Sequence, residues 1–203
     1  MDMPREIHRI VNDAGGVART ADFNAAGYAN YVVSDMCKRG LIVRIRSGYY
    51  ALPAQTSQDQ PEEEIIFQLF PDAIVCFDSA LFYYGYSDKA PLEWHLAFPR
   101  TVTRSRFNVD YPVIRYYTIQ KHLLSLGLST GDWNGVKLSV YDRERTICDC
   151  FKRRSQMDSE MFAKAVNAYA ADEKKNLSAL SQYAKKLRVH TKVAELMEVL
   201  LNG

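Results

Sequence analysis

Residues 15–52, GGVARTADFNAAGYANYVVSDMCKRGLIVRIRSGYYAL, constrain the fold more than any other stretch of this 203-residue chain. Apolar spacing there predicts two short helices followed by two strands, at residues 20–26, 29–38, 41–46 and 49–52. Gly27 lies between the helices and Gly40 follows the second one, at positions where a positive φ is often needed. Ser47 and Gly48 form the expected turn between the strands. This order of elements predicts a winged helix-turn-helix.

The second helix is expected to pack one face inward and to present the other to solvent. The apolar residues at helical spacing are Val32, Val33 and Met36. The opposite face carries Asn30, Tyr31, Ser34 and Lys38. Asparagine can bond adenine at two atoms, and lysine favours guanine or phosphate, so we expect this face to enter a major groove.

The two strands are expected to form a basic wing. Strict alternation would place Leu41, Val43 and Ile45 on the inner face and Ile42, Arg44 and Arg46 on the outer face. From Lys38 to Leu52 the chain has four basic residues and no acidic one, a local cluster that can neutralise phosphates. The full set of residues expected to contact DNA is Thr20, Tyr28, Asn30, Tyr31, Ser34, Lys38, Arg39, Arg44, Arg46 and Tyr49. The alternative is a winged module that mediates protein contacts only.

Charge and cysteine usage bound the class of protein. The formal net charge is +2, and the excess lies in residues 1–53, which hold 7 Lys and Arg against 5 Asp and Glu. The four cysteines, Cys37, Cys76, Cys148 and Cys150, have no disulfide or zinc-ligand spacing, so we expect small buried hydrophobic residues. The absence of an apolar leader or a membrane-length segment fits the cytoplasm and no membrane partner.

The rest of the chain is expected to form a second, mixed domain, which makes the fold α+β. We expect the winged domain over residues 1–53, a linker over 54–61 and a C-terminal α/β domain over 62–203. Residues 5–12 should add a helix to the first domain, and residues 62–70 should form a helix that ends near Pro71. Further expected elements are a helix at 81–86 with Asp78 or Ser79 as N-cap, strands at 92–98, 113–117 and 136–140 with a tight turn at Asn134-Gly135, and three C-terminal helices around 161–169, 177–187 and 193–201.

Residues 143–154, RERTICDCFKRR, allow two interpretations. One is functional: a catalytic Asp149, or a second basic contact surface made by Arg143, Arg145, Lys152, Arg153 and Arg154. The other is a helix with a solvated charged face, in which Asp149 pairs with Arg145, Lys152 or Arg153 at helical spacing.

Three segments taken in order resemble the AbiEi family of antitoxins from type IV toxin-antitoxin systems. The family's "G-(L/K)-(I/L)-x-R-(L/I)-x-x-G-x-Y" wing is matched by Gly40, Leu41, Arg44, Ile45, Gly48 and Tyr50, its "S-A-L-x-x-x-G" segment by Ser79, Ala80, Leu81 and Gly85, and its "E-R-T-x-x-D" segment by Glu144, Arg145, Thr146 and Asp149. Residues 5–170 carry the resemblance. The chain departs from the family in the bulky Phe82, Tyr83, Tyr84 and Tyr86 of the second segment.

The resemblance implies a repressor that binds an operator in double-stranded DNA, with inverted repeats, and regulates its own operon. It also implies that residues 62–203 counter a nucleotidyltransferase-like toxin encoded beside it, in phage abortive infection, without a stable complex.

The competing hypotheses are a regulator unrelated to a toxin, a protein-interaction adaptor, and an enzyme. A nuclease or phosphotransferase could use Asp78, Asp88, His95 and Asp149, with Ser79 as a nucleophile. No glycine-rich phosphate loop, HExxH or GxSxG motif accompanies them, and a lone histidine in a strand is more often a core residue. We therefore expect no catalytic residue, no cofactor and no metal.

Overall fold

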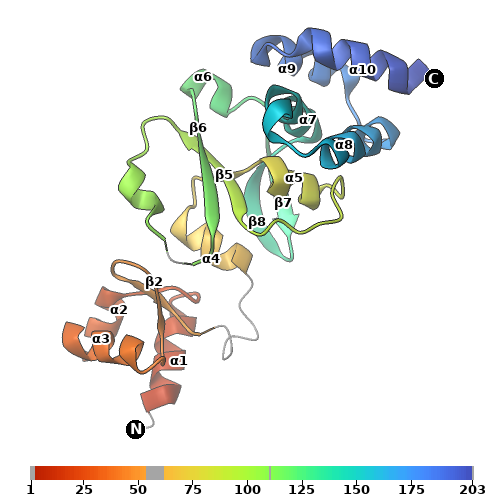
Figure 1. Ribbon diagram of the computed structural model, residues 1–203. Coiled ribbons are helices and arrows are strands. Elements are labelled where there is room, and N and C mark those ends of the chain that lie inside the picture. The colour runs from red at the N-terminus through yellow and green to blue at the C-terminus, as the bar shows by residue number, and fades with distance from the viewer. Residues whose placement is uncertain (1–2, 54–61, 110, 203) are drawn as a thin grey trace. The chain divides into compact units, whose positions relative to one another are not determined.

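The computed structural model describes residues 3–53, 62–109 and 111–202 and has a mixed α+β fold, as expected (Figure 1). Its described residues form ten α-helices, two short 3-10 helices and two β-sheets. By contacts the chain divides into two compact units. The first comprises residues 1–71 and 103–114, and the second comprises residues 72–102 and 115–203.

The first unit begins with the helix-turn-helix and wing. Its elements are α1 (Met3–Asp13), β1 (Ala18–Arg19), α2 (Thr20–Ala25), α3 (Asn30–Lys38), β2 (Val43–Arg46) and β3 (Tyr49–Ala51). The strands form an antiparallel sheet in the order β1-β3-β2. The expected inward residues of the helices do form the core, which contains Ile7, Ile10, Val11, Val33 and Met36. Strand β1 was not predicted, because two residues carry no periodicity.

The turns around α3 depend on glycine. Gly27 has φ +92° just before α3, and Gly40 has φ +69° just after it. Beyond Gly40, the Leu41 N–H donates to the Met36 carbonyl, a bond that closes a helix C-terminus when the intervening residue is left-handed. The two glycines therefore fix where α3 begins and ends.

Helix α4 (Glu62–Leu69) belongs to the first unit by its contacts, together with the 3-10 helix η1 (Arg104–Phe107). The Gln68 amide donates to the Gly15 carbonyl, and the Phe70 and Phe107 rings lie 6.4 Å apart. The expected C-terminal domain, residues 62–203, would begin with α4. The expected linker, residues 54–61, lies outside the described residues, so the domain boundaries stay a prediction.

The second unit is built on a five-stranded sheet. Its strands are β4 (Ile74–Val75), β5 (Trp94–Pro99), β6 (Ile114–Ile119), β7 (Leu128–Trp133) and β8 (Val136–Tyr141), in the order β6-β5-β4-β8-β7. Strand β4 pairs parallel with β8 and antiparallel with β5. The β7–β8 turn has φ +52° at Asn134 and +87° at Gly135, which confirms the expected tight turn. Strand β7 was missed because its residues LSTGDW are mostly polar and exposed.

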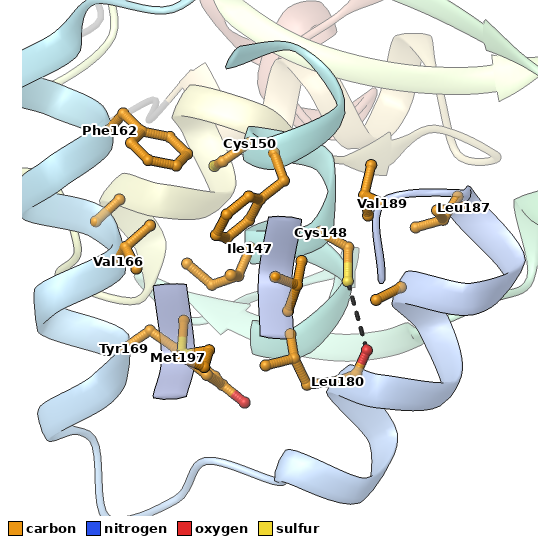
Figure 2. Packing of buried hydrophobic residues seen from close by; sticks show 14 of the residues in the cluster. Ile147, Cys148, Cys150, Phe162, Val166, Tyr169, Leu180, Leu187, Val189 and Met197 are labelled. Carbon is orange, nitrogen blue, oxygen red and sulfur yellow. Dashed lines mark hydrogen bonds between the residues drawn. The ribbon is translucent and has the colours of Figure 1, made fainter. Parts of the chain in front are cut away.

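The helices of the second unit pack against this sheet and against one another. They are α5 (Phe77–Tyr83), α6 (Lys121–Leu124), α7 (Arg143–Lys152), the 3-10 turn η2 (Arg154–Gln156), α8 (Ser159–Ala171), α9 (Leu177–Leu187) and α10 (His190–Asn202). The expected N-cap of α5 was wrong: Cys76 is the N-cap, and Asp78 and Ser79 lie inside the first turn. The main core gathers between α7, α8, α9 and α10, as Figure 2 shows, with Ile147 and Phe162 buried at its centre.

Three of the four cysteines are buried hydrophobic residues, as expected, and all four are free thiols. The Cys148 thiol donates to the Leu180 carbonyl at 3.7 Å (Figure 2). Burial raises the pKa of Cys148 to about 12 and raises the pKa values of Cys76 and Cys150 as well. Cys37, on α3, is half-buried.

Candidate nucleic-acid interface

The outward face of α3 carries the expected residues. Asn30, Tyr31, Ser34 and Lys38 are all exposed, whereas Val33 and Met36 are buried on the opposite face. Tyr31 is 78% exposed, which is unusual for a large aromatic side chain. An exposed tyrosine beside an asparagine and a lysine offers both stacking and hydrogen-bonding groups to a partner.

One acidic residue of this face was not anticipated. Asp35 is exposed, and its carboxylate lies 3.7 Å from the Arg39 guanidinium on the same helix. Both side chains are more than half exposed. Arg39, one of the residues expected to contact DNA, therefore presents a partly neutralised charge.

The wing departs from strict alternation. Arg44 pairs with Tyr50 and Arg46 pairs with Tyr49, so Ile45 is an extra, bulged residue between them. The expected positions of Ile42 and Val43 are wrong: Ile42 is buried in the core and Val43 is 40% exposed. The strand begins only at Val43, so Ile42 follows the turn after α3 and packs with the helices. Arg44 is exposed, as expected.

Arg46 and Tyr49 are joined by a cation–π contact. The Arg46 guanidinium carbon lies 4.0 Å from the centre of the Tyr49 ring, and both side chains are half-buried. Within the described part of the chain, the buried Arg46 Nε has no hydrogen-bond partner. This arginine is held in place by the ring, with part of its donor capacity unused.

Arg19 is an additional wing residue that sequence reasoning missed. Strand β1 pairs Arg19 with Tyr49, and the Arg19 guanidinium carbon lies 5.7 Å from the same ring. The side chain is exposed. The only sequence signal was its position directly before Thr20, the start of α2, where its backbone N–H donates to Asp22 at 2.6 Å. The wing therefore carries Arg19, Arg44 and Arg46 together.

Two residues of the expected set are tied to the scaffold. The Tyr28 hydroxyl donates to the Glu6 carboxylate at 2.6 Å, and that bond is the main cause of a raised Tyr28 pKa. The Thr20 N–H donates to the Gly48 carbonyl at 3.0 Å, which connects the start of α2 to the tip of the wing. Both side chains are half-buried, so they support the interface more than they extend it.

The expected C-terminal surface is not a single surface, because Arg145 is buried in the second unit with 1% of its area exposed. Its Nε donates to Asp149 at 3.0 Å, and one Nη donates to the Leu123 and Leu126 carbonyls at 2.7 and 2.9 Å. Burial raises the pKa of the Asp149 carboxyl, an effect that Arg145 opposes. Of the other four arginines and lysines, Lys152 is exposed, whereas Arg143, Arg153 and Arg154 are half-buried.

The segment Glu144 to Asp149 therefore has a structural role, because its polar side chains bind α7 to neighbouring segments of the second unit. The Glu144 carboxylate accepts from the Tyr169 hydroxyl at 3.1 Å and from the Asn176 N–H at 2.7 Å. The Thr146 hydroxyl donates to the Tyr141 carbonyl at 3.3 Å. Asp149 pairs with Arg145, as one interpretation expected, but the expected solvated face of this helix is wrong because residues 144–151 are all buried.

Of the residues named for an enzyme, Asp78, Ser79 and His95 lie together, whereas Asp88 and Asp149 are paired with other residues. The Ser79 hydroxyl is buried and accepts from the His95 backbone N–H at 2.9 Å, and Asp88 pairs with Lys164. His95 is buried, with Nδ1 3.1 Å from the Tyr117 hydroxyl and Nε2 3.8 Å from the Asp78 carboxylate. Burial lowers the pKa of His95 to about 4. These contacts agree with the expected core histidine.

The first region thus has the helices, turn and basic hairpin of a winged helix-turn-helix, with polar and cationic side chains on its outward faces. Residues 7–53 match the family described as "Transcriptional regulator, AbiEi antitoxin", which confirms the resemblance over this region. The match suggests a DNA-binding regulator and is consistent with a protein that is not an enzyme.

Two further comparisons bear on the whole chain. Its fold is similar to that in the crystal structure of the RV2827C protein from Mycobacterium tuberculosis, with 14% sequence identity, a TM-score of 0.58, and coverage of 98% of this chain and 80% of the other. No curated protein matches the sequence. No helix in the described residues has the length and apolar character that a membrane span requires.

Proposed function

We propose that this chain is a DNA-binding repressor of its own operon and the antitoxin of a type IV toxin-antitoxin system. The observation that supports the proposal is that the family match and the exposed polar and basic surface fall on the same residues. Residues 7–53 match an antitoxin regulator family, and the same residues present an exposed α3 face and a basic wing. The partner of the first unit is operator DNA, and the second unit counters a nucleotidyltransferase-like toxin without a stable complex.

We assign recognition of the operator base sequence to α3. Asn30 and Tyr31 are exposed at its first turn, so replacing both by Ala removes groups that reach base edges without opening the core. The double variant should lose operator preference, with each lost base contact weakening specific binding by about 1–3 kcal/mol. Asn12→Ala, at an exposed position of α1, is the matched control. Unchanged operator affinity and preference in the double variant would remove α3 from the interface.

We assign the sequence-independent part of the DNA affinity to the wing. Replacing Arg44 and Arg46 by Ala should weaken binding to operator and random duplex alike, and should reduce the salt slope of log affinity by about 2 per protomer. Because Arg46 also packs on Tyr49, Arg44→Ala alone is the cleaner variant, with a slope change of about 1 and no loss of stability. Arg9→Ala, on the exposed side of α1, is the control. A slope that stays constant while the melting temperature falls would show that these arginines only stabilise the wing.

We assign antitoxin action to the expected C-terminal domain, residues 62–203. The full chain carrying Asn30→Ala, Tyr31→Ala and Arg44→Ala should still rescue growth when the neighbouring toxin is expressed, although it no longer represses. Loss of rescue in this variant would show that neutralisation needs DNA binding. A neighbouring reading frame unrelated to nucleotidyltransferases would remove the antitoxin part and leave the repressor part standing.

A further inference from the structure

The second unit contains a large cavity that the proposed DNA contacts do not use. Its volume is about 1020 Å³. It lies where the end of β6, helix α6, helix α7 and the junction between α9 and α10 meet, and Arg100, just after β5, also lines it. A volume of this size is at the upper end of the range of small-molecule sites, about 300–1,000 Å³.

The lining of this cavity is strongly basic. Among the described residues that line it are seven lysines and arginines and a single acidic residue, Asp149, for a formal charge of +6. Asp149 is already paired with the buried Arg145. Within the described part of the chain, Arg188 and Lys192 form no ion pair, and Lys152 has only an electrostatic effect on the already paired Asp149. Convergent, uncompensated cations in a concave site repel each other and attract polyanions.

Apolar and aromatic residues also line the cavity. Phe77, Ile119 and Val189 line it, and the Phe77 ring lies 4.3 Å from that of Tyr117. The Arg153 guanidinium carbon lies 4.8 Å from the Phe77 ring centre and 4.5 Å from the Tyr117 ring centre, which fixes this cation against the rings. Such a site suits a ligand that combines a planar, poorly solvated part with several negative charges.

Arg188 holds an unusual backbone conformation at this site. It ends α9 with φ +62° and ψ +39°, a left-handed position where glycine is the ordinary residue. A non-glycine residue is strained in this conformation, and such strain is found most often at functional positions. The arginine is exposed and lines the cavity, so its charge is kept at a structural cost.

We propose that this cavity binds a nucleoside polyphosphate, with the phosphates on Lys152, Arg188 and Lys192 and the base beside Phe77 and Arg153. The ligand is a small molecule because the cations converge from several elements onto one hollow, whereas a duplex presents its phosphates on a convex surface. The proposal does not depend on DNA binding by the first unit.

Titration calorimetry of the full chain with ATP, GTP, CTP and UTP tests the proposal, with inorganic triphosphate as the ring-free probe. We expect one site per chain and weaker binding of triphosphate than of the preferred nucleotide. The double reversal Arg188→Glu with Lys192→Glu should weaken nucleotide binding at least about tenfold, because charge-assisted bonds are lost. Lys137→Glu with Lys174→Glu makes the same charge change at exposed positions outside the cavity and should leave binding unchanged.

Each alternative result overturns the proposal. Absence of binding at millimolar nucleotide, equal weakening by both double variants, or triphosphate binding as tight as that of any nucleotide would each do so. Displacement of the nucleotide by a short RNA that binds the cavity far more tightly would show a nucleic-acid site instead. The Arg44→Ala variant should bind nucleotide normally even if it fails on DNA, so failure of this proposal and failure of the proposed function are separable.

Discussion

Helices α3 and α7 each carry an aspartate and an arginine four residues apart, and the two pairs differ in almost every physical respect. On α3, Asp35 and Arg39 lie 3.7 Å apart with more than half of each side chain exposed. On α7, Arg145 and Asp149 lie 3.0 Å apart with 1% and 4% exposed. The exposed pair contributes little to stability, because both charged groups are well hydrated without the contact. In the buried pair, the Arg145 guanidinium also donates to two backbone carbonyl groups. Identical spacing therefore produces an exposed surface pair in one unit and a buried structural pair in the other.

The largest expected effect comes from breaking the buried pair. Asp149→Ala leaves the Arg145 guanidinium charged in the core without its carboxylate, which should destabilise the protein by about 3–5 kcal/mol. Urea unfolding monitored by circular dichroism measures the change. A variant that keeps the wild-type midpoint would show that water reaches Arg145 and that the two pairs are alike.

The pH dependence of stability provides a second test of burial in the second unit. The pKa of His95 is lowered to about 4 in the folded protein by burial, below the ordinary value of about 6.5, so the unfolded chain binds the proton first as pH falls. The stability from this group is complete above about pH 6.5 and should decline by about 3 kcal/mol as pH falls towards 4.

The measurement is the free energy of unfolding of wild type and His95→Gln between pH 4 and 7. The difference between the two proteins should vary with pH in that window. A constant difference would place His95 in a solvated environment.

Two glycines with positive φ, one near Arg145 and one next to Arg39, allow the packing around the two arginines to be compared. Replacing either glycine by Ala introduces a similar backbone strain. Gly127 has φ +72°, and an added Cβ would lie 2.5 Å from the Arg145 Cβ. Gly40, next to Arg39, has φ +69° with no described atom within 4 Å of such a Cβ. Both Ala variants pay the strain of about 1–2 kcal/mol, and Gly127→Ala should lose about 2 kcal/mol more. Equal melting temperatures for the two variants would contradict close packing around Arg145.

The smallest effect on stability is expected at the exposed pair. Asp35→Ala should change the free energy of unfolding by less than about 0.5 kcal/mol. Removing this negative charge from the outward face also releases Arg39, so DNA affinity at low salt should rise. Weaker DNA binding, measured by fluorescence anisotropy, would mean that Asp35 itself contacts the partner.

Sequence periodicity was sufficient for the elements whose stability is local. The buried Val33 and Met36, and Gly40 at the end of α3, follow from residue spacing and backbone preference alone. Strands β1 and β7 were missed, since one is two residues long and the other is stabilised by pairing with β8 more than by its own apolar residues.

Burial of charged residues could not be predicted from the sequence, because their partners are distant in the chain. Arg145 is satisfied by carbonyl groups of residues 123 and 126, and Glu144 by Tyr169 and Asn176. The candidate interface shows the same limit: the exposed residues of α3 were identified, whereas Arg19 became part of the wing only through the β1–β3 pairing.

The distribution of thiols gives each unit its own reporter of opening. Cys37 is half-buried on α3, while Cys76, Cys148 and Cys150 are buried in the second unit, and burial raises the pKa values of all four thiols. A thiol reagent at neutral pH attacks thiolates, so the three buried groups react only when their unit opens. Labelling rates resolved by mass spectrometry would therefore follow the accessibility of α3 through Cys37 and the opening of the second unit through the three buried thiols, in one unmodified protein. Cys37 follows Asn30 by seven residues and Ser34 by three, so a fluorophore attached there would sit at the edge of the face assigned to DNA and would also report DNA binding.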